Sequence, residues 1–149
     1  MNEATRVWHT SELVADGFDA LRNGGAQGLP LIEGRIMSVK ATPHDGSASH
    51  MSLGMSVIPP GYSTPAHSHP AEELATVLSG TGAIVIDGTR HEVRPGSMVL
   101  TPSQSVHVTS ADEGGPLILW WVYTPAGSEV RWLELGALDY GSGIPDSRA

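Results

Sequence analysis

Polar and apolar residues alternate most regularly between His50 and Ile58. The apolar members fall on one face of an extended chain and the small polar members on the other: Met51, Leu53, Met55 and Val57 against Ser52, Gly54 and Ser56. A period of two is typical of a β-strand. The methionine-bearing face has two interpretations. It belongs to the core of a barrel, or one of its methionines lines a substrate pocket, because a thioether adapts to apolar surfaces of many shapes.

Further short strands are predicted along the chain. The segment 33–42 alternates in the same way and places Arg35, Met37 and Val39 on one face. The dipeptide Asp87-Gly88 predicts a two-residue hairpin turn. The remaining strands are predicted at 74–79, 81–86, 89–94, 97–100, 106–110 and 117–123. Many short strands separated by turn residues predict an all-β antiparallel barrel or jelly roll.

The predicted barrel occupies residues 31–135 of a 149-residue chain, a length that suits one domain. Residues 1–30 are expected to form an N-terminal arm, with a short helical turn through Leu13 and Val14 and a flexible connector from Asn23 to Gly28. The segment 130–135 is expected to be a last strand or a helical turn. Residues 136–149 are expected to form a flexible C-terminal tail.

The segment 117–123, L-I-L-W-W-V-Y, is apolar on both faces. Such a strand is buried on both sides or covered by a partner, since an exposed apolar face of that size marks an interface. We therefore expect a homodimer.

Charge and composition narrow the classes of function. The formal net charge of −8 argues against non-specific binding to nucleic acid or to an anionic membrane. The chain has no apolar run of about 18 residues and no recognisable signal peptide, so it is expected to be cytoplasmic. It has no cysteine, which excludes disulfides and thiolate metal ligands.

The candidate chemistry begins with two histidines, His67 and His69, that stand two residues apart. On an extended chain they project from the same face and can converge on one cation. Pro70 interrupts the strand ladder, and the turn that it begins can bring the Glu73 carboxylate back toward the same point. Nitrogen and oxygen donors at this spacing suit a first-row divalent metal.

The wider pattern resembles the cupin superfamily. Its first motif is matched by Gly61, His67, His69, Glu73 and Gly80 at every fixed position. Its second motif is matched by Gly96, Pro102 and His107, with Gln104 in place of the usual glycine and Ala111 where asparagine is common.

The resemblance implies a cupin barrel and a metal held by His67, His69, Glu73 and His107. The metal would be one divalent transition ion, iron, manganese, nickel or zinc, with iron preferred. Gln104 has two interpretations: its amide points into the pocket, or it is a turn residue.

Three functions stay open for a site of this kind. The preferred one is an oxygenase acting on a small chelating or aromatic substrate, because methionine, tryptophan and leucine near the motifs suggest an apolar pocket. The alternatives are a redox-neutral lyase, isomerase or decarboxylase, and a ligand-binding protein without catalysis. The catalytic candidates are Gln104, Tyr123 and Arg35. Arg35 would suit a carboxylate substrate, whereas Tyr123 is either a structural phenol or a catalytic acid.

Overall fold

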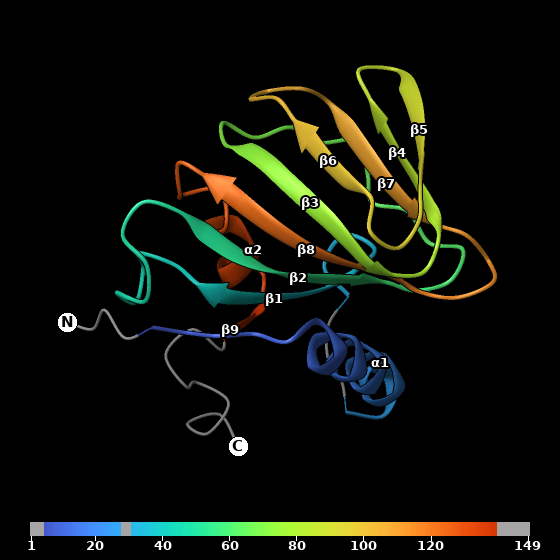
Figure 1. The fold of residues 1–149 in the computed structure, drawn as a ribbon, viewed down its shortest axis with the longest axis horizontal. Helices are drawn as coiled ribbons and strands as arrows, with labels where there is room; N and C mark the ends of the chain where they lie inside the picture. The colour runs from blue at the N-terminus through green and yellow to red at the C-terminus, as the bar shows by residue number, and fades with distance from the viewer. Residues whose placement is uncertain (1–4, 28–30, 140–149) are drawn as a thin grey trace.

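The computed structural model describes residues 5–27 and 31–139 and shows two β-sheets with two helices (Figure 1). The strands are β1 (Ile36–Ala41), β2 (Ser52–Ile58), β3 (Glu72–Ser79), β4 (Gly82–Ile86), β5 (Thr89–Val93), β6 (Met98–Thr101), β7 (His107–Ala111), β8 (Leu117–Thr124) and β9 (Leu138–Asp139). The helices are α1 (Thr10–Gln27) and α2 (Val130–Glu134).

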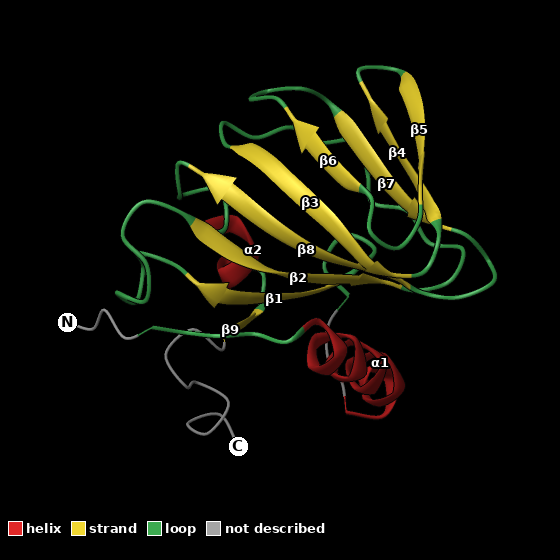
Figure 2. Cartoon of the chain, viewed as in Figure 1, coloured by secondary structure: helices red, strands yellow, loops and turns green. Residues whose placement is uncertain are grey.

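The larger sheet has the strand order β6-β3-β8-β2-β1-β9, and the smaller one has the order β5-β4-β7. Every pair is antiparallel except β1 with β9. Strands make up most of the regular structure (yellow in Figure 2). The prediction of an all-β antiparallel jelly roll is confirmed.

Turn residues divide the chain into strands where the sequence predicts. Asp87 and Gly88 both have positive φ and join β4 to β5. Gly80 separates β3 from β4 with φ of 86°, and a Cβ there would lie 2.0 Å from the Pro116 carbonyl oxygen. Only glycine fits such a position, because it combines a left-handed backbone with a close approach of another chain segment.

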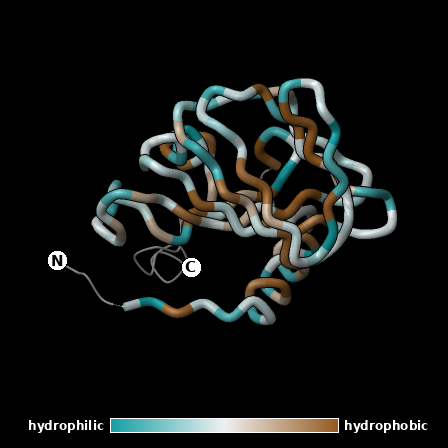
Figure 3. Tube along the Cα trace, turned by 45° about the horizontal axis from the view of Figure 1, so that its top comes forward, coloured by the Kyte–Doolittle hydropathy of each residue, from teal (hydrophilic) through white to brown (hydrophobic). Residues whose placement is uncertain are grey.

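Apolar side chains fill the space between the two sheets. Hydrophobic segments (brown in Figure 3) follow the strands. One buried cluster joins the sheets and consists of Ile58, Val77, Ile84, Val93, Ala111, Leu117 and Leu119. A second cluster lies at the end of the barrel next to α2 and includes Met37, Trp121, Tyr123 and Trp132.

The methionine-bearing face of β2 does not look into the barrel. Met55 and Val57 pack outside the larger sheet, in a cluster with Leu13 of α1. The small residues of β2 face inward, where Trp121 needs the room: a Cβ at Gly54 would lie 2.5 Å from its ring. Met55 is therefore a core residue beneath a helix and does not line the space between the sheets, whereas Met51, which precedes β2, is exposed.

Helix α1 corrects the prediction of a short helical turn. It has 18 residues and includes 23–27, which we expected to be a flexible connector. Its apolar side chains lie against the outer face of the larger sheet, below β1 and β2 in Figure 1. This packing stabilises a helix despite its glycines, since tertiary contacts override weak local propensity.

Helix α1 and Trp8 cover the outer face of β8, so this face no longer argues for a partner subunit. Ile118 is fully buried under α1, and Trp120 lies against Trp8 with ring centroids 5.3 Å apart. The homodimer therefore stays a prediction without that support.

Two further expectations concern the C-terminal part of the chain. The segment 130–135 contains a helix, α2, as one of the two alternatives predicts. Residues 138–139 of the expected tail pair with β1, while 140–149 lie outside the described residues. Within the part of the chain that is described, neither helix has the length and apolar character needed to cross a membrane.

Candidate metal centre

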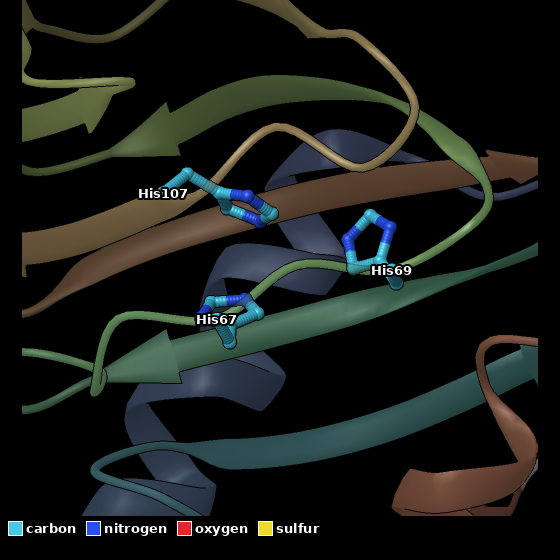
Figure 4. Close-up of side chains that lie close together, drawn as sticks. All are labelled: His67, His69 and His107. Carbon is cyan, nitrogen blue, oxygen red and sulfur yellow. The ribbon is translucent and has the colours of Figure 1, made fainter.

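Three histidines from the β2–β3 connection and β7 point toward one another (Figure 4). One ring nitrogen from each of His67, His69 and His107 lies within 4.8 Å of the other two. His67 and His69 belong to the segment that leads into β3, and His107 begins β7. Backbone hydrogen bonds hold the two segments together, His67 N to His107 O at 3.1 Å and His107 N to His67 O at 2.8 Å.

Backbone carbonyls orient all three imidazole rings in the same way. Nδ1 lies 2.8 Å from the Pro65 oxygen in His67, 3.0 Å from the Ala71 oxygen in His69 and 2.9 Å from the Ser105 oxygen in His107. Because a carbonyl oxygen can only accept, each Nδ1 carries a hydrogen and donates it. In the neutral ring this leaves the Nε2 lone pair for an electrophile, which is the arrangement that metal-binding histidines need.

Glu73, the second residue of β3, places a carboxylate beside two of these rings. Its Oε1 lies 3.1 Å from His69 Nε2 and 3.6 Å from His107 Nε2. A hydrogen bond between Glu73 Oε1 and His69 Nε2 requires a proton on Nε2 in addition to the one on Nδ1. A cation between Oε1 and Nε2 would take the place of that proton. His107 Nε2 is buried and has no hydrogen-bond partner among the described residues.

The electrostatics of the centre favour a charged carboxylate and a neutral His67. Burial disfavours the charged form of Glu73, but the neighbouring His107 and His69 outweigh it and lower its pKa to about 2. Burial lowers the pKa of His67 to about 4. Burial also opposes the charged form of His107, yet the Glu73 carboxylate raises the pKa of that ring.

The donor set fits a divalent metal. Three imidazole nitrogens and one carboxylate oxygen suit first-row divalent ions from manganese to zinc. The unpartnered Nε2 of His107 and the shared orientation of the rings are the features that such an ion would satisfy. The structure therefore brings together the four residues that the motifs indicate, with Glu73 at the side of the histidine cluster.

Arg35 and Tyr123, two of the catalytic candidates, lie beside this centre. Both line an inner cavity of about 20 Å³ that also includes His67, Glu73 and His107. Arg35 is 5% exposed and Tyr123 is 2% exposed. Burial lowers the pKa of Arg35 and raises the pKa of the Tyr123 phenol well above its usual range.

Gln104, the third candidate, lies outside the cavities that contain the histidines. Its side chain is exposed, and its φ of 63° explains why glycine is usual at this point of the motif. Its backbone N–H donates to the His69 carbonyl at 2.8 Å. Of the two interpretations of Gln104, the structure therefore supports the turn residue.

Sequence analysis missed Trp132 of α2. Its Nε1–H donates to the Tyr123 oxygen at 2.9 Å, and the Arg35 guanidinium lies over its ring, 4.4 Å from the centroid. An outer groove of about 220 Å³ runs beside it and is lined by His67, Ser68, His69, Pro70, Gly127, Ser128, Arg131 and Trp132. No local pattern in 130–135 indicates that this tryptophan reaches the histidines.

Comparisons with known proteins agree with this architecture. Residues 54–123 match the family model described as Cupin domain. The chain is 32% identical over 99 residues to dimethylsulfoniopropionate lyase DddW of Ruegeria pomeroyi, which covers 66% of this chain and 60% of the lyase. It is 34% identical over 71 residues to L-ectoine synthase of Hyphomonas neptunium, which covers 44% of this chain and 53% of the synthase.

A crystal structure of a cupin protein from Bacteroides fragilis resembles this one with a TM-score of 0.53 and 26% identity, over 66% of this chain and 82% of that chain. The chain spans less than two thirds of the length of the two curated relatives. The two motifs, the family match and the shared fold identify this chain as a member of the cupin superfamily.

Proposed function

We propose that this protein is a metal-dependent lyase that cleaves a small organic substrate without oxidation or reduction. The observation that carries the proposal is the convergence of His67, His69 and His107. In each ring a backbone carbonyl accepts the Nδ1 hydrogen, which leaves Nε2 available to a metal ion. A divalent ion held there supplies Lewis acidity to a substrate oxygen. The similarity to a dimethylsulfoniopropionate lyase supports elimination as the reaction.

The polarity of the inner cavity favours a lyase over an oxygenase. Our preference for an oxygenase rested on an apolar pocket, but the cavity beside the histidines is lined by Arg35, Ser56, Thr109 and Tyr123 as well as by apolar residues. Met55, which was one ground for that preference, lies beneath α1. We expected iron, but the donor set does not distinguish it from manganese, nickel or zinc.

The residues around the centre suit an elimination. In this reaction a solvent base takes a proton from the carbon beside a carboxyl group, the electron pair of that C–H bond forms a carbon–carbon double bond, and the leaving group departs with its bonding pair. Tyr123 holds a phenolic proton inside the cavity and can donate a hydrogen bond to a substrate oxygen. The walls around Tyr123 exclude bulk water, which strengthens every such contact.

Proton NMR tests the proposal. The protein is loaded separately with manganese, iron, nickel or zinc and incubated under argon with small carboxylates that carry a leaving group at carbon 3, beginning with dimethylsulfoniopropionate. New vinyl proton signals without oxygen are the expected result, and the metal-free protein and His69→Ala should give none. Turnover that occurs only in air, with matching oxygen uptake, would instead establish the oxygenase.

A further inference from the structure

We propose that Arg35 and Tyr123, oriented by Trp132, form an anion-binding subsite that takes a carboxylate group of the substrate. The inference rests on the proposed function and names the residues that bind the carboxyl group of its substrate. It assigns Arg35 and Tyr123 to substrate contact and makes Trp132 a positioning residue.

The guanidinium of Arg35 is buried and has no carboxylate in direct contact among the described residues, although Glu73 and Glu33 act on its charge from a longer distance. Its side chain is 5% exposed, and its Nε has no hydrogen-bond partner among the described residues. No carboxylate in the described part of the chain forms an ion pair with it. A buried unpaired charge is costly, so a fold that keeps one is expected to pair it with a bound group of opposite charge.

The charges of the loaded centre also require an anion. Two positive charges of a divalent ion and one of Arg35 stand against the single negative charge of Glu73. Two positive charges then remain in a cavity with little access to water, where electrostatic interactions are strong. A carboxylate that contacts both the ion and Arg35 would remove part of this excess.

Trp132 contacts both donors. Its ring centroid lies 4.4 Å from Arg35 Cζ, a cation–π contact that helps to fix the position of the guanidinium. Its Nε1–H donates to the Tyr123 oxygen at 2.9 Å, which occupies an acceptor position and leaves the phenolic O–H free to donate. Two donors in one cavity match the two oxygens of a carboxylate.

The sizes of the two cavities limit the ligand. The inner cavity of about 20 Å³ has room for little beyond an ion and the end of one small group. His67 lines both this cavity and the outer groove of about 220 Å³. The carboxylate is therefore the part that enters the inner cavity, and the body of a small substrate follows into the groove.

A titration with propionate and propionamide tests the subsite. Zinc-loaded protein is followed by the shifts of its indole N–H signals in ¹H–¹⁵N NMR, which include that of Trp132. We expect propionate to bind at least tenfold more tightly than propionamide, because the amide lacks the charge. Arg35→Met should weaken propionate binding at least tenfold, and Arg35→Lys should weaken it less, since it keeps the charge but loses the planar fork.

Arg90→Met is the matched control. Arg90 is an exposed arginine on β5 that pairs with Glu92 at 3.7 Å, so its loss should change the affinity less than threefold. The subsite is overturned if the acid and the amide bind alike, if propionate does not bind, or if Arg35→Met binds it as the wild type does. Arg131→Met removes the exposed arginine of the outer groove, and a loss equal to that of Arg35→Met would place the anion in that groove and also overturn the subsite.

A double-mutant cycle tests the role of Trp132. Trp132→Phe keeps a ring over Arg35 but deletes the N–H, and should weaken propionate binding several-fold in the wild-type background. In the Tyr123→Phe background the same change should have no further effect, because the phenol that the Trp132 N–H orients is then absent. Additive losses would overturn the positioning role. The titration does not depend on turnover, so carboxylate binding without elimination would refute the lyase and leave the subsite standing.

Discussion

At the scale of single residues, the local features of the metal centre could be predicted and the distant ones could not. His67 and His69 are two residues apart, so the sequence alone indicates that they share a face. Placing His107 with them required the resemblance to cupins. Trp132 reaches Tyr123 only through the folded chain, and no spacing rule links a short helix to the strand before it.

Glu73 supplies the negative charge of the candidate metal centre. Its pKa of about 2 keeps it ionised at every pH at which the protein is expected to work. Glu73→Gln keeps the size and removes the charge, so we expect zinc affinity to fall at least tenfold. Calorimetric titration of wild type and variant with zinc checks this. An unchanged affinity would show that the carboxylate is not a ligand.

Gln104 has a backbone conformation that favours glycine. With φ of 63° it pays a conformational cost, while its side chain is exposed. Gln104→Gly should therefore raise the free energy of unfolding by about 0.5–1 kcal/mol, after allowing for the greater freedom of glycine in the unfolded chain. Urea unfolding at pH 7 measures the change. A loss of stability would mean that the Gln104 side chain makes a contact that matters.

At the scale of elements, the periodicity of β2 gave the strand correctly but not the environment of its two faces. An alternating pattern shows that the faces differ, and it does not show which one looks into a barrel. Here α1 supplies a second apolar layer, so Met55 packs under the helix while Gly54 makes room for Trp121. A helix that depends on this packing, and contains several glycines, is equally hard to predict from propensity.

Helix α2 is anchored by Glu129, a second residue that sequence analysis missed. This residue is 1% exposed, and its carboxylate accepts hydrogen bonds from Thr42 Oγ1 at 2.6 Å, Ser52 Oγ at 2.7 Å and Gly127 N at 2.7 Å. Thr42 and Ser52 lie far away in the sequence, in the β1–β2 part of the larger sheet. The anchor therefore fixes the helix that carries Trp132.

The Glu129 anchor predicts a pH-dependent stability. Burial opposes its ionisation, but the Thr42 and Ser52 hydroxyls and the Gly127 N–H outweigh burial and lower its pKa below 4.5. Such a group stabilises the fold above its unfolded-state pKa and loses that contribution as the pH falls through its folded-state pKa. Glu129→Gln should cost about 1.5–3 kcal/mol at pH 7.

Urea unfolding of wild type and Glu129→Gln between pH 7 and pH 3 measures this contribution. The difference in unfolding free energy should be constant above about pH 5.5 and shrink as the pH falls below 4.5. A difference that stays the same down to pH 3 would show that the charge of Glu129 is not responsible.

At the scale of the whole molecule, the metal centre joins parts of both sheets. Glu73 lies in the larger sheet and His107 in the smaller one. His67 and His69 lie in the β2–β3 connection, which pairs with the smaller sheet through the bridge between His67 and His107. An ion bound at this centre would therefore crosslink the jelly roll. The sequence predicts this arrangement only to the extent that it predicts a closed barrel, since only a closed barrel brings the two motifs together.

Metal binding should consequently stabilise the entire fold. A ligand that binds only the folded state adds about 2.7 kcal/mol when its free concentration is 100 times its dissociation constant. For a domain of this size we expect the midpoint of thermal unfolding to rise by about 5–10 °C with saturating zinc. Calorimetry with zinc and with a chelator measures the shift. His107→Ala should abolish it, because the smaller sheet then loses its ligand, whereas His91→Ala on the exposed face of β5 should keep the full shift. A variant without His107 that still gains the wild-type increment would show that the two sheets are not joined through the metal, and the assignment of the second motif would fail with it.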